Sequence, residues 1–385
     1  MSEKAPSSPS PAEQRAFYDE QFREQAEKRN RRAIPRLLRF FGAKDKTGVD
    51  MAEASAIKEN EDFERRQTAE YGEWHKRLEV VLGHILEKKN SPEGKQRRIV
   101  LLIMGGGVQG AYGMGQLIAL NKLGMGSESG IFKAVIGISA GSAAGASYMG
   151  GDKQSEIGAT IFEEECTSPE FINFSRIHKI MDADFLAETV RSGPKAIDQD
   201  AIRRSPTEFY VVATHRDTGA ELINAKTAKP DMVSALHASI SIGILPFYGK
   251  QNMVNEKMYA DGAFDPVPIQ KILDTFQPTD ILVLPNSSFE GADGFVLSKE
   301  MFAIGSAVPA IGSLGVAKKM LKNREEMRRF LEDVEQRTDV NIGFMWPQEA
   351  GLSAITQDPA AIKMAIHEAT QDTLEEFKSV GLKES

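Results

Sequence analysis

The run IVLLIMGGGVQGAYGMG, residues 99–115, constrains the fold more than any other part of the chain. Six apolar residues stop at three consecutive glycines, and small and apolar residues at helical spacing follow them. A short apolar run bounded by glycine is typical of a strand that is buried on both faces. The pattern therefore predicts a strand over Ile99–Met104, a glycine-rich turn, and a helix over Ala111–Leu123.

The same alternation of strand and helix continues along the chain. Further strands are predicted over Ala134–Ile138, Phe209–Thr214, Glu221–Ala225, Met258–Ala260 and Asp280–Leu284, and long helices over Gly315–Gln336 and Ala360–Val380. Such alternation predicts an α/β fold in which helices cover both faces of a mostly parallel central sheet, a three-layer sandwich.

Composition divides the chain into three predicted parts. Residues 1–30 are rich in Ser and Pro and then in Gln, Glu and Arg, which is typical of a disordered or solvated tail. Residues 31–95 form a predicted helical extension, in which apolar residues at three-to-four spacing indicate a helix over Glu53–Lys89. The turn-forming cluster NSPEGK, residues 90–95, marks a boundary, and residues 96–385 form the main predicted domain.

A basic segment lies within the extension. Residues 28–46 contain eight basic residues and one acid, together with leucines and phenylalanines. Such a segment is typical of a contact with a membrane surface. A solvated charged run that docks a few apolar side chains on the main domain is the alternative, which Pro35 favours because proline interrupts a helix.

Composition also excludes several functions. A net charge of −8 argues against general nucleic-acid binding, and the single cysteine, Cys166, excludes an internal disulfide and a cysteine-based zinc site. No apolar run reaches the ~18 residues that a membrane span needs. The first residues contain no apolar segment typical of a secretory signal, so we expect a cytoplasmic protein, with export by a route that reads no N-terminal signal as the alternative.

Gly105, Gly107 and Gly110 fit the G-x-G-x-x-G pattern of dinucleotide sites. A dinucleotide site also expects an acidic residue at the end of the second strand. The second predicted strand ends instead in GISAG, residues 137–141, and Glu128 lies in the loop before that strand. Nucleotide binding therefore stays an alternative that the second strand does not support.

GISAG fits the G-x-S-x-G pattern of a nucleophile elbow. A sharp turn from strand to helix would present the hydroxyl of Ser139 above the edge of the sheet. Gly137 and Gly141 lack a Cβ atom, so the backbone can fold tightly beside the serine. The N-terminus of the next helix would direct partial positive charge at Ser139. The alternative is a turn rich in small residues without a chemical role.

The earlier glycine loop would then have a role in the same chemistry. Successive backbone N–H groups of Gly106, Gly107 and Val108 can converge into a nest that binds an oxyanion. An acyl-transfer enzyme needs such donors where charge develops on the carbonyl oxygen.

A serine nucleophile also needs a base. None of the six histidines stands out as that base: His75, His84, His178, His215, His237 and His367. His215, for example, lies in the polar turn HRDTG, where a histidine is usually solvated. Asp261 does stand out, because it ends the strand MYADG at the same edge of the sheet as Ser139. An Asp-Gly pair is also a common surface turn, so both interpretations of Asp261 stay open.

Three motifs follow one another in the chain: GGGVQG at residues 105–110, GISAG at 137–141 and DGA at 261–263. Together they resemble the patatin-like phospholipase family, which is related to cytosolic phospholipase A2. The stretches HASISIGILPF, ATHRDTG and FDPVPIQ are similar to further segments of that family. The resemblance covers roughly residues 97–290.

The resemblance implies a lipid acyl hydrolase of the phospholipase A type that needs no histidine, metal or cofactor. Ser139 would be the nucleophile and Asp261 the general base. The oxyanion loop would include Gly105, Gly106, Gly107 and Gly110. Membrane phospholipids would be the substrates, which implies peripheral membrane contact through the basic segment 28–46 or the apolar loop Gly294–Gly305.

The sequence departs from the family pattern at three positions. Gln109 stands where the family usually has Arg or Lys, Ala263 replaces a glycine of the acid motif, and Gly243 stands where proline is frequent. The loss of a cation at Gln109 bears on rate or headgroup preference. It also keeps open a non-hydrolytic lipid- or protein-binding module on the same scaffold. Lipase, acyltransferase and lysophospholipase activities would share the dyad, and the sequence predicts no oligomeric state.

Overall fold

The computed structural model describes residues 72–91, 93–173, 175–176, 181–215, 217–241, 252–262, 267–286, 331, 333–347 and 351–382. All of them belong to one compact unit, Tyr71–Ser385. Several predictions lie outside the described residues: the tail of residues 1–30, the basic segment 28–46, the apolar loop Gly294–Gly305, most of the helix Gly315–Gln336, and the positions of Gly243 and Ala263.

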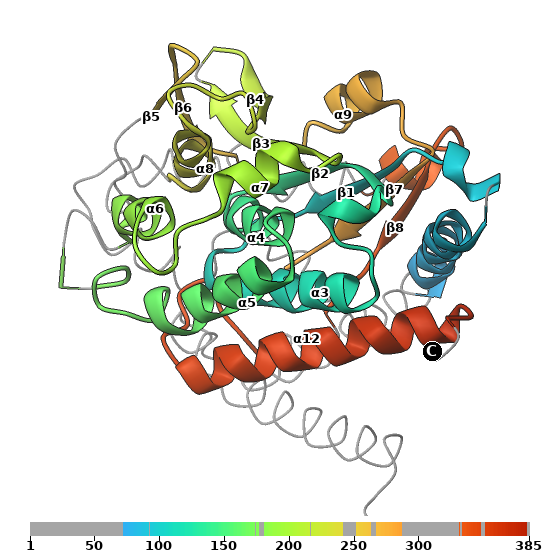
Figure 1. Ribbon diagram of the computed structural model, residues 1–385, viewed down its shortest axis with the longest axis horizontal. Coiled ribbons are helices and arrows are strands. Elements are labelled where there is room, and N and C mark those ends of the chain that lie inside the picture. Colours follow the sequence, from blue (N-terminus) through green and yellow to red (C-terminus); the bar gives the residue numbers. More distant parts are fainter. Residues whose placement is uncertain are drawn as a thin grey trace, which may run out of the picture. The chain divides into compact units, whose positions relative to one another are not determined.

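An eight-stranded sheet forms the centre of the unit (Figure 1). Its strands are β1 (Ile99–Ile103), β2 (Phe132–Ile138), β3 (Glu208–His215), β4 (Gly219–Asn224), β5 (Asn252–Val254), β6 (Lys257–Asp261), β7 (Asp280–Leu284) and β8 (Asn341–Phe344). The order is β5-β6-β3-β2-β1-β7-β8, and β4 also pairs with β3. Strands β3, β2, β1, β7 and β8 are parallel to one another, whereas β4 and β6 are antiparallel to β3.

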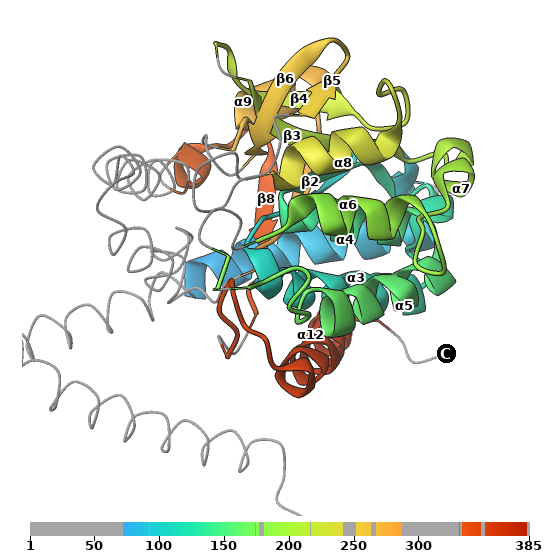
Figure 2. The same cartoon turned by 90° about the vertical axis from the view of Figure 1, so that its left-hand side faces the viewer.

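The helices cover both faces of this sheet. They are a helix over residues 72–90, α3 (Gly110–Lys122), α4 (Ala140–Met149), α5 (Asp152–Thr160), α6 (Ala183–Arg191), α7 (Gln199–Arg204), α8 (Met232–Ile240), α9 (Ile269–Phe276) and α12 (Pro359–Ser379). Short turns of helix occur at η1 (Glu93–Gln96), η2 (Gly107–Gln109), η3 (Ser127–Ser129) and η4 (Ile161–Glu165). Figure 2 shows α8, α6, α4, α3 and α12 on one side of the sheet, and Figure 1 shows α9 on the other.

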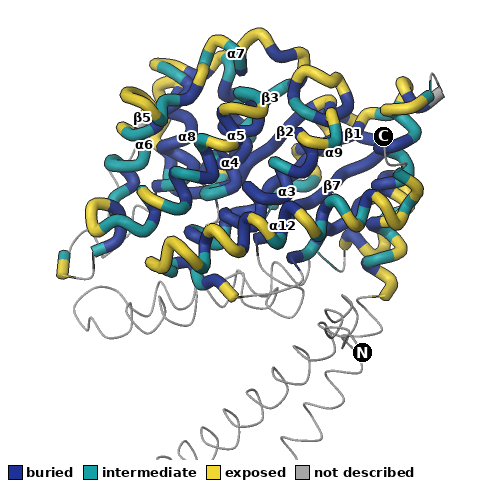
Figure 3. The backbone as a smooth tube through the Cα atoms, turned by 60° about the horizontal axis from the view of Figure 1, so that its bottom comes forward, coloured by how far each residue is buried: buried dark blue, intermediate teal, exposed yellow. Residues whose placement is uncertain are grey.

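Alternate residues of β1 explain the three layers. Ile99, Leu101 and Ile103 belong to the apolar core beneath α3, α4 and α12, whereas Val100 and Leu102 belong to a second core beneath α9. Successive side chains of a strand point to opposite faces, so a strand with no polar residue must be covered on both. Figure 3 shows the sheet buried and the outer turns of α9 and α12 exposed. The α/β fold with a mostly parallel sheet is confirmed.

The helix over residues 72–90 is the described part of the predicted helix Glu53–Lys89. Its apolar stripe is buried in the core of this unit, including Leu78, Leu82 and Ile85. The division of the chain at residues 30 and 95 stays a prediction. None of the helices in the described part is long and apolar enough to cross a membrane.

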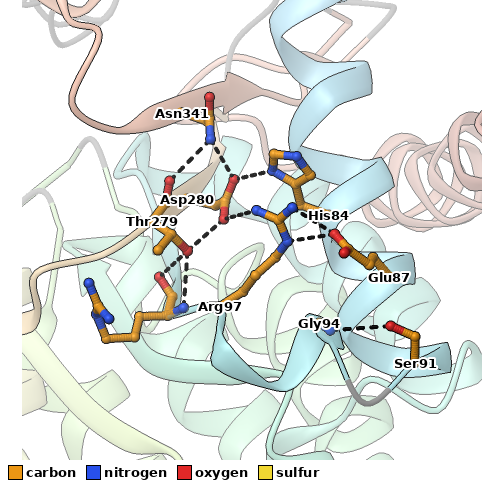
Figure 4. A network of polar contacts seen from close by, with 9 residues as sticks. His84, Glu87, Ser91, Gly94, Arg97, Thr279, Asp280 and Asn341 are labelled. Atoms are coloured by element: carbon orange, nitrogen blue, oxygen red, sulfur yellow. Dashed lines mark hydrogen bonds and ion pairs between the residues drawn. The ribbon is translucent and has the colours of Figure 1, made fainter.

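A fully buried carboxylate fixes the end of the sheet where β7 begins (Figure 4). Asp280 Oδ1 lies 2.6 Å from His84 Nδ1 and accepts a hydrogen bond from Asn341 Nδ2 at 3.0 Å. Its Oδ2 accepts from Thr279 Oγ1 at 2.7 Å and lies 3.6 Å from Arg97 Nη1. A buried carboxylate is tolerated only with such partners. The network therefore joins the helix over residues 72–90 and β8 to β7.

Replacing Asp280 with Asn tests this network. The substitution keeps the size of the side chain but leaves Arg97 without its buried counter-charge, so we expect a loss of about 3–5 kcal/mol in the free energy of unfolding. Urea unfolding followed by circular dichroism measures it. Asp274→Asn, at an exposed position of α9, is the control and should change stability by less than about 0.5 kcal/mol. Equal effects of the two substitutions would show that Asp280 does not stabilise the sheet.

Candidate active site

Ser139 lies on a strained turn between β2 and α4. Its backbone has φ 52° and ψ −125°, a conformation that non-glycine residues rarely adopt. The flanking glycines permit this turn: a Cβ atom at Gly141 would lie 2.4 Å from the carbonyl oxygens of Ile103 and Met104. A Cβ atom at Gly137 would lie 2.3 Å from the backbone of α4. The turn thus has the geometry of a nucleophile elbow.

Asp261 reaches Ser139 because β2 and β6 meet end to end. The last residue of β2, Ile138, pairs with Val212 of β3, and the last residue of β6, Asp261, pairs with the next one, Ala213. Since β4 pairs with this part of β3 along its other edge, β2 and β6 share one edge and run toward each other. Their carboxyl ends meet there, and Ser139 Oγ donates a hydrogen bond of 2.7 Å to Asp261 Oδ2.

The backbone of Asp261 is held from both sides. Its N–H donates to the carbonyl of Ser241 at 2.8 Å, and its carbonyl accepts from Thr214 Oγ1 at 2.9 Å. Asp261 is 2% exposed, and a Cβ atom at Gly262 would lie 2.3 Å from the carbonyl oxygen of Val212. The Asp-Gly pair is therefore not an exposed surface turn, because its glycine is required by close packing against β3.

Ser239 of α8 fills the junction between the two strands. Its Oγ donates to the carbonyl of Val212 at 2.7 Å and accepts from the N–H of Ser139 at 3.0 Å. Ser239 is fully buried. The hydroxyl of Ser239 thus pairs with the N–H of Ser139 and the carbonyl of Val212 at the point where the pairing of β2 with β3 ends. The sequence analysis did not single out Ser239, although it lies in the stretch HASISIGILPF that resembles the family.

The glycine loop lies directly beside the elbow. A Cβ atom at Gly105 would lie 3.0 Å from the Cβ of Ser139, and one at Gly110 would lie 2.8 Å from the Cβ of Ala140. Gly106 and Gly107 adopt positive φ values of 150° and 60°. The loop can approach the serine this closely because Gly105 and Gly110 carry no side chains.

The amides of this loop differ in what they bind. The N–H of Val108, which we expected in the oxyanion nest, donates instead to the carbonyl of Ala354 at 3.1 Å. No hydrogen bond joins the N–H of Gly106 or Gly107 to any residue in the described part of the chain. These two amides are therefore donors that the loop can offer to a ligand.

Asn286, at the end of β7, supports the loop and is fully buried. Its Nδ2 donates to the carbonyl of Met104 and, at 3.3 Å, to that of Gly105, while its Oδ1 accepts from the N–H of Gly113 at 2.9 Å. One amide side chain thus joins the start of the glycine loop to α3, the helix that follows it. Nothing in the sequence pattern around Asn286 indicated this contact.

Other side chains that could act as a base or nucleophile have partners away from Ser139 or are buried. His84 pairs with Asp280, and His237 lies 3.0 Å from Asp184. Burial raises the pKa of the Cys166 thiol to about 12, so the thiol stays protonated at neutral pH. Within the described ranges no group of three or more His, Cys, Asp or Glu side chains is arranged to hold a metal ion.

A serine on an elbow, a carboxylate hydrogen-bonded to it and a glycine loop beside it thus lie together on an α/β sheet, an arrangement typical of folds with a nucleophile elbow. Residues 101–273 match the family model described as patatin-like phospholipase. The chain therefore contains a patatin-like phospholipase domain, and the resemblance seen in the sequence is confirmed. This match supports lipid acyl hydrolase activity in general.

Among solved structures, this chain is similar to VipD from Legionella pneumophila. The two are 13% identical, the match covers 75% of this chain and 67% of that one, and the TM-score is 0.35. No curated protein matches the sequence.

Replacing Gly141 with Ala tests the close packing at the elbow. The added Cβ atom would collide with two backbone carbonyls that cannot move without distorting β1, so we expect a loss of about 3 kcal/mol in the free energy of unfolding. Gly83→Ala is the matched control, because a Cβ atom there meets nothing within 4 Å and Gly83 lies in a helix. It should stabilise the protein by up to about 1 kcal/mol. Similar denaturation midpoints for the two variants would contradict the packing described for the elbow.

Proposed function

We propose that the protein hydrolyses fatty-acyl esters of phospholipids with Ser139 as nucleophile and Asp261 as general base. The hydrogen bond of 2.7 Å between Ser139 Oγ and Asp261 Oδ2 carries this proposal. A nucleophile and its base must lie within hydrogen-bond distance, and here the base is a carboxylate rather than a histidine.

The first half of the reaction acylates the serine. As Ser139 Oγ attacks the ester carbonyl, its proton passes to Asp261 Oδ2 and the carbonyl oxygen becomes negatively charged. The amides of Gly106 and Gly107 and the N-terminus of α4 would stabilise this charge. The tetrahedral intermediate then collapses, the C–O bond breaks, and the leaving lyso-lipid oxygen takes the proton from Asp261.

The second half releases the fatty acid. Asp261, again unprotonated, accepts a proton from a water molecule that attacks the acyl-enzyme. The second tetrahedral intermediate forms on the same oxyanion donors, and its collapse returns the proton to Ser139 Oγ. One carboxylate thus serves both steps, and proton and electron pairs balance over the cycle.

The strained elbow supports this assignment. A backbone conformation such as that of Ser139 costs on the order of 1–3 kcal/mol, and it persists where the surrounding structure holds it. Gly137, Gly141 and Ser239 hold it here, and the result is a half-buried hydroxyl directed at a buried carboxylate. Such preorganisation is what a catalytic nucleophile requires.

The alternative is a non-hydrolytic module that binds lipid or protein on the same scaffold. Gln109 favours it, because a cation that the family usually places there is missing. Within enzymes, lipase, acyltransferase and lysophospholipase activities would use the same two residues. Lipid mass spectrometry after incubation of phospholipids, lysophospholipids and triacylglycerols with the protein distinguishes these activities by their products.

Replacing Ser139 with Ala or Asp261 with Asn tests the dyad. Each substitution removes one partner of the proton transfer, so hydrolysis should fall by about 10³-fold or more. Ser139→Ala should also abolish labelling by a fluorophosphonate probe. Ser379→Ala, at an exposed site on α12, should leave labelling and hydrolysis unchanged. Labelling that survives in Ser139→Ala would place the nucleophile at another serine.

Deleting residues 1–46 tests the proposed membrane contact. The basic segment 28–46 carries eight basic residues, and each that lies near an anionic surface contributes about 1 kcal/mol at low salt. Co-sedimentation with phosphatidylserine vesicles should therefore fall by at least about tenfold, while fluorophosphonate labelling in solution persists. Vesicle binding that persists after the deletion would exclude this segment as the contact.

A further inference from the structure

The segment Gly351–Ala354, here called the strap, lies against the glycine loop although it comes from the far end of the chain. Leu352 and Ala354 are 4% and 7% exposed. The segment leads into α12, which packs closely on α3: Thr370 Oγ1 donates to the carbonyl of Gly115 at 3.0 Å. A Cβ atom at Gly115 would lie 2.3 Å from the carbonyl oxygen of Ile366. The strap therefore reaches the loop from a firmly anchored helix.

Two backbone carbonyls of the strap receive hydrogen bonds from the loop. The carbonyl of Ala354 accepts from the N–H of Val108 at 3.1 Å, and that of Leu352 accepts from Gln109 Nε2 at 3.0 Å. The contact is tight, because a Cβ atom at Gly107 would lie 2.6 Å from the carbonyl oxygen of Ala354. The loop residue that follows the two candidate oxyanion donors is thus fixed to the strap.

Tyr112, in the first turn of α3, holds the strap from the other direction. Its hydroxyl oxygen accepts from the N–H of Gly351 at 2.9 Å and from the N–H of Leu352 at 3.2 Å. Tyr112 and Leu352 are both 4% exposed, so the N–H of Leu352 would lack a partner in a buried place without this hydroxyl. Residues 108–112 and the strap are thereby joined through donors and acceptors on both sides.

The loop needs such support, because glycine is the residue with the greatest backbone freedom. Gly106 and Gly107 both adopt positive φ, and adjacent glycines do not by themselves select one conformation. Asn286 fixes the loop where it leaves β1, and the strap fixes it where α3 begins. The two amides between these supports owe their direction to both.

We propose that the strap is a positioning element for the oxyanion loop and that Gln109 and Tyr112 are the residues that fasten it. Gln109 acts through its hydrogen bond to Leu352 and not on the substrate. The uncharged side chain would thus have a structural role at the position where the family usually places a cation. The inference rests on the proposed hydrolase function, since it concerns how the donors for the oxyanion are held.

Turnover depends strongly on such placement. Losing one oxyanion donor costs about 10²–10³ in kcat, and a misplacement of about 1 Å can cost 10²-fold. The strap's hydrogen bonds described above join it to Val108, Gln109 and Tyr112, so loosening it should slow the formation of the tetrahedral intermediate more than it weakens substrate binding.

Gln109→Met and Tyr112→Phe test the proposal, because each keeps the bulk of the side chain and removes one hydrogen-bonding group. We expect kcat for ester hydrolysis to fall by about tenfold or more in both, with KM changed less than about twofold. Gln109→Arg keeps an N–H donor and should recover most of the turnover. Gln116→Met is the matched control on α3: Gln116 Nε2 donates to the carbonyl of Met345 at 2.8 Å, away from the strap.

Hydrogen exchange supplies a readout that needs no activity. The amides of Val108 and Gln109 should exchange at least about tenfold faster in Gln109→Met and Tyr112→Phe than in the wild type, and as in the wild type in Gln116→Met. If the wild type neither hydrolyses esters nor reacts with a fluorophosphonate, the proposed function fails, and the exchange rates alone decide whether the strap holds the loop.

Any of three results would overturn the proposal. The first is exchange at Val108 and Gln109 that stays at the wild-type rate in Gln109→Met and Tyr112→Phe. The other two apply to an active enzyme: a loss of kcat in Gln116→Met as large as in these two variants, or no loss of kcat in any of the three. Melting temperatures of all variants above the assay temperature ensure that the comparison is made on folded protein.

Discussion

The end-to-end meeting of β2 and β6 along one edge of β3 is the constraint on which the candidate site depends. A parallel and an antiparallel strand occupy successive stretches of that edge, and their last residues pair with Val212 and Ala213. The register of β3 thus sets the distance between the serine and the aspartate. A slip of one residue in either strand would turn a side chain to the opposite face and separate the pair.

The second requirement is that the backbone segments around Ser139 lie close together with their polar groups paired. Residues from distant parts of the sequence supply these partners. The carbonyl of Val212 would lack a partner at the junction without Ser239, and the glycine loop would lack a fixed path without Asn286 and the strap. Buried backbone groups must be paired, so each departure from regular strand geometry near Ser139 is matched by a polar group that completes it. These supporting groups outnumber the two residues assigned to the chemistry.

The sequence predicted the parts of this arrangement that are local. The buried strand β1, the elbow at Ser139 and the glycines around it follow from short patterns of apolar and small residues. The order of three motifs then indicated Asp261 through the family resemblance. Ser239, Asn286 and the strap were missed because their partners lie far away in the sequence. The Val108 amide was assigned to the oxyanion nest for the same reason: only the folded chain brings Ala354 to it.

The range that matches the family ends at residue 273, before β7 begins. A fragment cut there would keep the serine, the aspartate and every glycine of both turns. It would also uncover the edge of β1 that β7 occupies, a row of five fully buried apolar residues with free backbone donors and acceptors. Such an edge recruits other chains, so the fragment should aggregate. The smallest soluble portion of this protein is therefore set by the pairing of its central strand and not by the extent of its recognisable motifs.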